Sequence, residues 1–437
     1  MEADGFSTTI AEATQLVRLR CSVKNYDWGR IERESCVARL YSRNTGEEVR
    51  EDIPYAELWM GTHDSGPAYV VASSDNGLTN GGVKEEKFSL TLKDWIQRNP
   101  TLVGEKVVQT WGPDLPFLFK VLSVAKALSI QAHPDKDLAA RLHKEQPEVY
   151  KDANHKPEMA LALTEFEALC GFVSFEELKL VVQTVPEIGE IVGSGHVEEV
   201  LHESAHEVGE RAKPILQSLF TTLMSASSDV ISQALTKLIS RLNVKNEERE
   251  LTEKEQLILR LEKQYPSDVG VITAFLFNHV KLSPGEALYL GANEPHAYLF
   301  GECIECMATS DNVVRAGLTP KDRDVKTLCS MLTYNQVFPK ILKGDALSHY
   351  TKRYSPPFDE FEVDHCILPR LVTTVFPAAP GPFIFLVFTG EGTMTTRSSN
   401  EAVAEGDVLF APANTNVTVS TATTGLSVFR AGVKSSF

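Results

Sequence analysis

The pattern of hydrophobic and polar positions divides the chain into three stretches. Up to about residue 135, and again from Val271 onward, short apolar runs alternate with turn residues, which predicts strands; Phe117–Val124 is the clearest run. Between about residues 174 and 265, apolar side chains recur at every fourth position, as in Ile215, Leu219 and Leu223, which predicts helices. We therefore expect a mainly β protein with an inserted helical block.

Two segments of the β-rich part resemble each other. Pro284–His296 and Glu405–Val417 both run from a glycine and an acidic residue through apolar positions to an Ala-Asn turn, at a constant spacing of 121 residues. This predicts one strand–turn–strand unit used twice. The pattern is typical of cupin-type jelly rolls, in which the last position is a metal ligand; here it is His296 in the first copy and Val417 in the second. We expect two cupin-type jelly-roll β-barrels, of which only the first binds a metal.

These patterns predict four consecutive regions. Residues 1–173 form the first part of a catalytic barrel, with some N-terminal strands pairing with the C-terminal barrel, and residues 174–268 form the helical insert. Residues 269–335 complete the catalytic barrel, and residues 336–437 form a C-terminal barrel without metal ligands. Within the insert, Thr252 followed by Glu255 forms a capping-box pattern, which predicts that a helix begins there.

Composition narrows the classes of function. With 43 Lys and Arg against 59 Asp and Glu, the formal net charge is −16, which argues against binding to nucleic acid or to anionic membranes. No apolar run approaches the ~20 residues that span a membrane, and the acidic start, with Glu2 and Asp4, is unlike a secretory signal. The seven cysteines are sparse and odd in number. We expect a cytoplasmic monomer that acts on a small molecule.

The candidate chemistry is concentrated in three polar motifs. If residues 126–136 include a strand, Ser129, Gln131 and His133 lie on one of its faces. Two later motifs add a glutamate and a second histidine. Such a mixed nitrogen and oxygen set suits Zn²⁺. The candidate ligands are Gln131, His133, Glu158 and His296.

A site of this kind would be locally cationic, although the whole chain is acidic. One Zn²⁺ with a single carboxylate and three neutral ligands has a net positive charge. The nearby cations Lys120, Lys156, Arg315 and Lys321 add to it. The isolated Cys303-x-x-Cys306 pair lacks further ligands, so we interpret it as part of a partly buried strand and not as a second zinc site. The net charge therefore does not exclude an anionic substrate.

Seven motifs together resemble the type I phosphomannose isomerase family, and its eukaryotic members most closely. The resemblance extends from about Leu16 to Ala431. The motifs are Tyr26–Gly29, Glu57–Gly61, Pro116–Lys120, Ser129–Pro134, His155–Glu158, Glu294–Tyr298 and Glu305–Gly317.

This resemblance implies a zinc-dependent isomerase that interconverts mannose 6-phosphate and fructose 6-phosphate. It also implies one Zn²⁺ per chain on Gln131, His133, Glu158 and His296, and an active-site arginine at Arg315. We expect the reaction to pass through a cis-enediol and to supply mannose 6-phosphate for GDP-mannose synthesis and glycosylation.

The roles of the remaining candidates are hypotheses. The catalytic base is open between Glu305, His155 and Lys156, whereas Arg315 is permanently charged and suits a clamp for an enediolate or a phosphate better. Asp311 is expected to hold the Arg315 guanidinium. The candidate substrate or phosphate contacts are Ser129, Lys120, Tyr298, Asp311 and Lys321, and the candidate pocket-wall residues are Asp27, Trp28 and Glu57.

Two other classes of function remain as alternatives. A non-catalytic sugar-binding protein with two cupin barrels is expected to lack the cations around the ligands. A cupin oxygenase with Fe²⁺ prefers a 2-His-1-carboxylate or three-His set, and a fourth ligand at Gln131 would occupy a position that dioxygen chemistry needs open.

Overall fold

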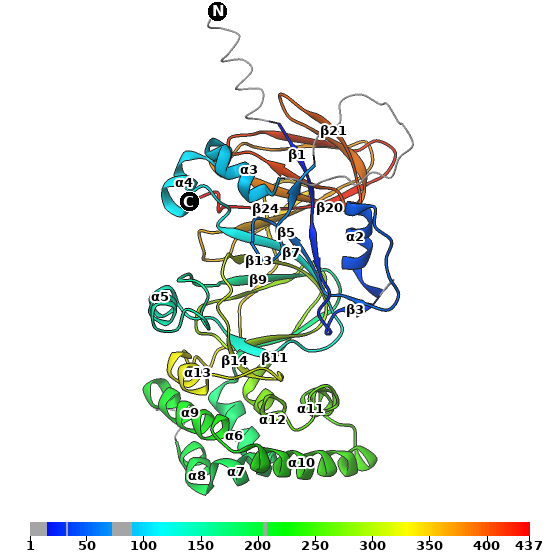
Figure 1. The fold of residues 1–437 in the computed structure, drawn as a ribbon. Helices are drawn as coiled ribbons and strands as arrows, with labels where there is room; N and C mark the ends of the chain where they lie inside the picture. Colours follow the sequence, from blue (N-terminus) through cyan, green and yellow to red (C-terminus); the bar gives the residue numbers. More distant parts are fainter. Residues whose placement is uncertain (1–14, 32–33, 72–89, 204–207) are drawn as a thin grey trace, which may run out of the picture.

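The computed structural model describes residues 15–31, 34–71, 90–203 and 208–437, so Glu2 and Asp4 lie outside the described residues. The described chain is mainly β, with two large antiparallel sheets and a group of helices. Figure 1 shows the three parts in a row, with the C-terminal strands at one end, a second group of strands in the middle and the helices at the other end.

The middle group of strands, which we call the site-bearing sheet, is organised around one long strand, β13 (His296–Ala308). Its first residues pair with β8 and β10, and from Gly301 onward it pairs with β7 and, from Cys303 onward, with β9. Gly301 has a φ of 108°, and a Cβ there would meet the Glu165 carbonyl oxygen at 2.4 Å, so a glycine is needed where the strand changes neighbours. The other strands of this sheet are β2 (Ser22–Lys24), β5 (Glu57–Met60), β7 (Phe117–Val124), β8 (Ile130–Ala132), β9 (Glu158–Ala162), β10 (Phe166–Phe172), β11 (Phe277–Leu282), β12 (Ala287–Leu290), β14 (Val314–Gly317) and β15 (Ile341–Leu342).

The second large sheet, which we call the C-terminal sheet, includes two strands from the start of the described chain. Val17–Leu19 of β1 pair with Val408–Phe410 of β22, and β1 also pairs with β6. Conversely, one strand from the C-terminal region belongs to the site-bearing sheet. Strand β15 lies within residues 336–437, which the sequence assigned to the C-terminal barrel, but it pairs with β12. The strands are β1 (Val17–Arg20), β6 (Tyr69–Val70), β16 (Asp345–Ala346), β17 (Thr351–Tyr354), β18 (Glu362–Leu368), β19 (Thr373–Phe376), β20 (Phe383–Thr395), β21 (Asn400–Ala404), β22 (Val408–Ala411), β23 (Val417–Ser420) and β24 (Leu426–Gly432).

The repeat seen in the sequence has the same backbone in both copies. Strands β12 and β22 lie at equivalent positions of the two copies, and β13 and β23 begin at His296 and Val417. Gly285 and Gly406, before the strands, have φ angles of 86° and 89°. In the turns after them, Asn293 and Asn414 have φ angles of 62° and 59°. The prediction of one strand–turn–strand unit used twice is therefore confirmed.

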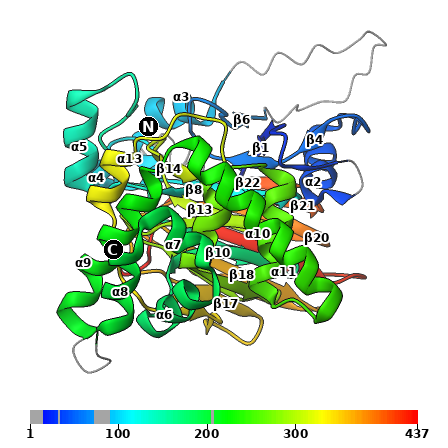
Figure 2. The ribbon, with the colours of Figure 1, turned by 90° about the horizontal axis from the view of Figure 1, so that it is seen from below.

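The helices fall into a compact block and several single helices. The block, α6 to α12 with a short η3, covers one end of the site-bearing sheet (Figure 2). It shares one hydrophobic core with that sheet, in which Phe172 of β10 packs on Phe220 and Tyr334. The helices of the block are α6 (Phe175–Thr184), α7 (Pro186–Val192), α8 (Ser194–His202), α9 (Val208–Met224), α10 (Ser228–Glu248), α11 (Glu253–Gln264), α12 (Val269–Thr273) and η3 (Ala274–Leu276).

The remaining elements are short. A small separate sheet pairs β3 with β4. These elements are α2 (Cys36–Thr45), α3 (Leu92–Arg98), η2 (Pro100–Val103), α4 (Glu105–Trp111), α5 (Lys136–Glu145), α13 (Val325–Met331), β3 (Arg30–Ile31) and β4 (Pro54–Tyr55).

Local sequence signals were right for β7 and for the start of α11, whereas the strands expected up to about residue 135 are interrupted by the helices α2, α3 and α4. The run Phe117–Val124 is strand β7, with every residue buried, and α11 begins with the predicted capping box of Thr252 and Glu255. The sequence placed the return to strands at Val271, whereas the chain remains helical until Leu276. A short apolar run of this kind fits a buried helix as well as a strand, because period alone does not separate them.

Three further observations bear on the expectations from composition. No helix within the described ranges is long and apolar enough to cross a membrane. All seven cysteines are free and buried, and Cys303 and Cys306 both lie on β13.

Candidate active site

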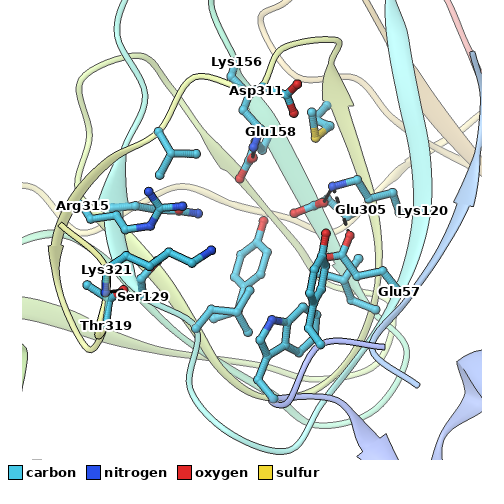
Figure 3. Close-up of a pocket in the computed structure, with 18 of the residues that line it drawn as sticks. Glu57, Lys120, Ser129, Lys156, Glu158, Glu305, Asp311, Arg315, Thr319 and Lys321 are labelled. Atoms are coloured by element: carbon cyan, nitrogen blue, oxygen red, sulfur yellow. Dashed lines mark hydrogen bonds and ion pairs between the residues drawn. The ribbon is translucent and has the colours of Figure 1, made fainter. Parts of the chain in front are cut away.

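A cavity of about 410 Å³ opens beside the site-bearing sheet. Its walls come from β5, β7, β8, β9, β13 and β14 and from the segment after β14. Figure 3 shows three groups of side chains around it. Glu57, Lys120 and Glu305 lie on one side, Arg315, Lys321, Ser129 and Thr319 on the opposite side, and Lys156, Glu158 and Asp311 between the two groups.

His133, Glu158 and His296 form a buried cluster next to this cavity. The Nε2 atoms of His133 and His296 lie 3.3 Å and 3.4 Å from the two carboxylate oxygens of Glu158. All three side chains are at most 2% exposed, and one potential ligand atom from each lies within 4.8 Å of the others. His133 directly follows the end of β8, and Glu158 and His296 are the first residues of β9 and β13, so three strand ends bring these atoms together.

The histidine tautomers leave both Nε2 atoms available as ligands. The Nδ1 of His133 lies 2.7 Å from the Asn312 carbonyl oxygen, and that of His296 lies 3.0 Å from the Glu294 carbonyl oxygen. Each Nδ1 must therefore carry the proton and donate it, which leaves a lone pair on Nε2. Neither buried Nε2 has a hydrogen-bond partner.

The ionisation of the cluster also fits a cation. Burial lowers the pKa of His133 to about 4, so its imidazole is neutral at pH 7. Burial opposes the charged form of Glu158, but His133 and Lys156 outweigh it and hold the pKa of that carboxyl well below its usual value. Two imidazoles and one carboxylate are a donor set that a divalent metal such as Zn²⁺ fits.

The structure places Gln131 next to the cluster of His133, Glu158 and His296. Strand β8 lies between β13 and β14, so Gln131 pairs with His296 on one side and with Arg315 on the other. The Gln131 side chain lines the cavity. Its role as a fourth ligand remains a prediction.

Lys120, Glu305 and Glu57 form a buried charged cluster on one side of the cavity. The Lys120 Nζ lies 2.9 Å from a Glu305 carboxylate oxygen and 3.4 Å from one of Glu57, and Trp59 Nε1 donates to Glu57 at 2.6 Å. Burial would lower the pKa of Lys120, but the two carboxylates raise it above its usual value. Burial and the Glu158 and Glu57 carboxylates raise the pKa of Glu305, although Lys120 opposes this. The sequence had suggested that Lys120 contacts a phosphate, but in the structure its ammonium is paired with the carboxylates of Glu57 and Glu305.

The opposite side, which we call the cationic wall, consists of Ser129, Arg315, Thr319 and Lys321 (Figure 3). Burial lowers the pKa of the Arg315 guanidinium, which still leaves it charged at pH 7. Within the described part of the chain, neither Arg315 nor Lys321 makes an ion pair through its side chain. Their charges are therefore available to an anion in the cavity.

Two candidates have partners other than those expected from the sequence. Asp311 was expected to hold Arg315, but its carboxylate lies 3.2 Å from the Nε2 of His63. His155 was a candidate acid or base, but its Nε2 lies 2.6 Å from a carboxylate oxygen of Glu360, and its side chain does not line the cavity. Both partners are distant in sequence and come from segments that the motifs do not include.

The other candidates do line the cavity. Lys156 lies 3.4 Å from Glu158. Burial, with the Glu305 and Glu158 carboxylates, raises the pKa of Tyr298 well above its usual value, and its buried hydroxyl has no hydrogen-bond partner. Asp27 pairs with Lys126 at 3.5 Å and Trp28 stacks on Tyr26, both at the cavity wall.

The sequence missed three cavity residues that could have been found. His63 lies two residues after the Glu57–Gly61 motif, and its ring meets the Trp59 indole edge-on at 5.1 Å. Thr319 lies two residues after the Glu305–Gly317 motif, and Lys126 begins the segment that carries Ser129. Extending each motif by a few residues would have included them.

The fold and the site together define a mainly β protein with a buried histidine–carboxylate cluster beside a cavity that is cationic on one side. Comparisons with known proteins are more specific. The catalytic-domain model of type I phosphomannose isomerase matches residues 16–175, and the helical-insertion-domain model of the same family matches residues 191–277. The mannose-6-phosphate isomerase 2 of Arabidopsis thaliana is 57% identical over 97% of this chain and 95% of its own. The Bos taurus mannose-6-phosphate isomerase is 41% identical over 96% and 99%.

Solved structures agree with these sequence matches. A zinc-bound mannose 6-phosphate isomerase has a TM-score of 0.78 at 30% identity, over 96% of this chain and 99% of its own. A mutant phosphomannose isomerase from Salmonella typhimurium has a TM-score of 0.79 at 29% identity, over the same shares. The chain belongs to the type I phosphomannose isomerase family and is an enzyme of that family, as its motifs predict.

Proposed function

We propose that this protein is a zinc-dependent aldose–ketose isomerase that interconverts mannose 6-phosphate and fructose 6-phosphate. The observation that carries the proposal is the pair of unpartnered Nε2 atoms facing Glu158, next to a cavity with a cationic wall. The first feature fits a metal that polarises a sugar oxygen, and the second fits a phosphate. The names of the relatives support the same substrate.

In this proposal one Zn²⁺ per chain is held by His133, Glu158 and His296, with Gln131 as the fourth ligand. A bound Zn²⁺ would supply Lewis-acid stabilisation of negative charge on the sugar oxygens at C1 and C2. Arg315 and Lys321, with Ser129 and Thr319, would bind the phosphate and orient the chain of the open sugar.

The residues proposed to transfer the proton between C2 and C1 lie on the side of the cavity opposite the cationic wall. We assign the base to Glu305, because its carboxylate is buried, lines the cavity and has a raised pKa, which makes it a stronger base. It would take the proton from C2 and return it to C1 on the same face through a cis-enediol, while the hydroxyl proton passes from O2 to O1. Lys120, 2.9 Å away, would hold the carboxylate in place. Lys156 is the alternative base, because it too lines the cavity.

A direct test combines turnover with metal content. The purified protein is assayed with mannose 6-phosphate and with unphosphorylated mannose, before and after treatment with a chelator, and zinc is measured on the same samples. We expect turnover of the phosphorylated sugar only, loss of turnover with the metal, and recovery on adding Zn²⁺. A chelated protein that binds no metal and keeps its full rate would contradict the proposal.

The same samples address the two alternatives. A non-catalytic sugar-binding protein would bind mannose 6-phosphate without turning it over. An iron oxygenase would consume dioxygen and regain activity with Fe²⁺ in place of Zn²⁺. A non-catalytic sugar-binding protein has no evident need for the buried Lys120–Glu305 pair in the cavity.

We extend the proposal to the protein's organisation and setting. The two large sheets are proposed to be cupin-type jelly-roll barrels, with the regions 1–173, 174–268, 269–335 and 336–437 as the units of the chain. The protein is proposed to act as a cytoplasmic monomer and to supply mannose 6-phosphate for GDP-mannose synthesis. Its mass in solution, measured by light scattering, tests the monomer.

A further inference from the structure

One aspartate of the helical block, Asp268, binds the backbone of the segment that carries Thr319 and Lys321 of the cationic wall. Asp268 caps helix α12, where its Oδ1 accepts a hydrogen bond from the backbone N–H of Gly270 at 2.6 Å. The same Oδ1 accepts from the N–H of Leu318 at 2.7 Å, and Oδ2 accepts from the N–H of Thr319 at 3.2 Å. A cap needs only the first of these bonds, so the other two join the helix to the segment after β14.

The segment that Asp268 holds has an unfavourable backbone conformation. Leu318 has a φ of 53°, in the left-handed region that branched side chains rarely adopt. Such a conformation persists only where the surroundings hold it. The two hydrogen bonds from consecutive N–H groups to one carboxylate provide such a hold.

Two glycines bring the helix and the strand end close enough for these bonds. A Cβ on Gly270 would lie 2.4 Å from the Leu318 nitrogen, and a Cβ on Gly317 would lie 2.5 Å from the Gly270 Cα. No side chain fits between the two backbones at this point. The position of the segment relative to α12 is therefore closely defined.

The same helical connection also holds the start of the neighbouring wall segment. The Tyr265 hydroxyl donates to the Ala127 carbonyl oxygen at 2.5 Å, and the Ala127 N–H donates to the Gln264 side chain at 3.0 Å. Ala127 lies two residues before Ser129. Residues 264–268 run from the last residue of α11 to the N-cap of α12. They thus contact both segments that carry the cationic wall.

The segment held by Asp268 carries two members of that wall. Thr319 and Lys321 lie beside Arg315 in the cavity (Figure 3). Since a monoanionic or dianionic group needs several donors at fixed positions, a displaced segment would bind it less well even with every side chain present.

We propose that Asp268 is a positioning residue for the phosphate group: by holding Leu318 and Thr319, it places Thr319 and Lys321 next to Arg315. This inference rests on the proposed function, in which the cationic wall receives the phosphate. It gives the helical block a part in substrate binding through one carboxylate, without contact between that carboxylate and the substrate.

The test uses Asp268→Ala and Asp268→Asn in the full-length, zinc-loaded protein. We expect Asp268→Ala to raise the KM for mannose 6-phosphate and the Kd for inorganic phosphate, measured by calorimetry, by about tenfold each, with kcat within about threefold. Asp268→Asn keeps one carbonyl oxygen as an acceptor, so it should show a smaller rise in both constants. Zinc content should equal that of the wild type in both variants.

Thr252→Ala is the matched control, because it removes the cap at the start of α11 in the same block. The contacts with the wall segments come instead from Gln264 and the residues after it, at the other end of the helix. It should lower the melting temperature while leaving KM and the phosphate Kd unchanged. Unchanged constants in Asp268→Ala, or an equal rise in Thr252→Ala, would overturn the inference. If Asp268→Ala does not fold, the same comparison is made with Asp268→Asn.

The two readouts separate this inference from the proposed function. A wild type that binds inorganic phosphate but does not turn over mannose 6-phosphate would contradict the function, while the phosphate Kd of the variants would still decide the role of Asp268. A wild type that turns over the sugar, with variants that bind phosphate equally well, would contradict only the role of Asp268.

Discussion

The two large sheets carry a buried ion pair at corresponding positions, with the charges exchanged. In the site-bearing sheet, Glu305 on β13 faces Lys120 on β7. In the C-terminal sheet, Arg430 on β24 faces Asp364 on β18, and the two side chains are ion-paired. One pair lines a cavity, whereas the other is enclosed. The same strand arrangement thus places a charged pair at a cavity in one half and inside the packed core in the other.

The correspondence follows from the register of the strands. The repeated strands β12 and β22 pair with β9 and β20, and in this register Glu158 faces Leu290 whereas Phe383 faces Ala411. Glu158, the carboxylate proposed to bind the metal in one half, therefore corresponds to Phe383 in the other. At the same time, His296 corresponds to Val417.

In the C-terminal sheet, aromatic side chains fill the space around the buried charge of Arg430. The Arg430 guanidinium lies 4.0 Å from the ring centre of Phe383 and 4.6 Å from that of Phe376, so aromatic rings occupy the space around it. Asp364 also binds Arg353, through Nε at 2.8 Å and Nη2 at 3.0 Å. This cluster is fully occupied by its own partners, which suits a structural role.

Removing a histidine should have opposite outcomes in the two halves. We expect His296→Ala to lose its zinc and about 10³-fold in turnover, since Lewis-acid stabilisation contributes several kcal/mol. His365→Ala removes a histidine of the C-terminal sheet, where burial lowers the pKa to about 4 and the ring stacks on Phe429 at 4.1 Å. It should keep zinc and turnover. Zinc analysis and the isomerase assay check both, and equal losses would remove the contrast.

Neutralising the enclosed pair should mainly affect stability. Asp364 is 1% exposed, and Asp364→Asn would leave the buried Arg430 without its counter-charge. We expect a loss of about 3–5 kcal/mol in the free energy of unfolding, measured with denaturant, because an uncompensated buried charge is costly. Turnover per folded molecule should be unchanged. A variant of normal stability would mean that the pair does not stabilise this half.

Neutralising the cavity pair should mainly affect turnover. We expect Glu305→Gln to lower kcat by about 10²-fold or more, the usual contribution of a general base, with zinc still bound. Its melting temperature should fall less than that of Asp364→Asn. Near-normal turnover would transfer the base role to Lys156, because His155 is held by Glu360 outside the cavity.

Restoring one histidine to the second half should not create a metal site. Val417→His places an imidazole at the position that corresponds to His296, but Phe383 stands where the first half has Glu158. We expect the zinc content to stay at the wild-type value, and a loss of about 1–3 kcal/mol from burying a polar ring at a site that is 1% exposed. A second equivalent of zinc would show that the carboxylate is dispensable.

Much of the fold and the site was visible in the sequence because the signals are local. The period of apolar residues predicted strand β7 and the helical block, and a two-residue pattern predicted the cap of α11. The repeat predicted that His296 and Val417 occupy corresponding positions. Seven short motifs identified the family. Each of these signals, including each copy of the repeat, lies in a short continuous segment, where chain geometry alone relates spacing to orientation.

Contacts between distant segments were decided by the tertiary structure. The His155–Glu360 pair and the Asp311–His63 pair join residues that are separated by hundreds of positions. The sequence predicted that some N-terminal strands pair with the C-terminal part, but only the structure identifies β22 as the partner of β1. The sequence did identify Glu305 and Lys120, but not that they neutralise each other. Many carboxylates are available to one lysine or histidine along an acidic chain, and only the packing of strands and loops selects the partner.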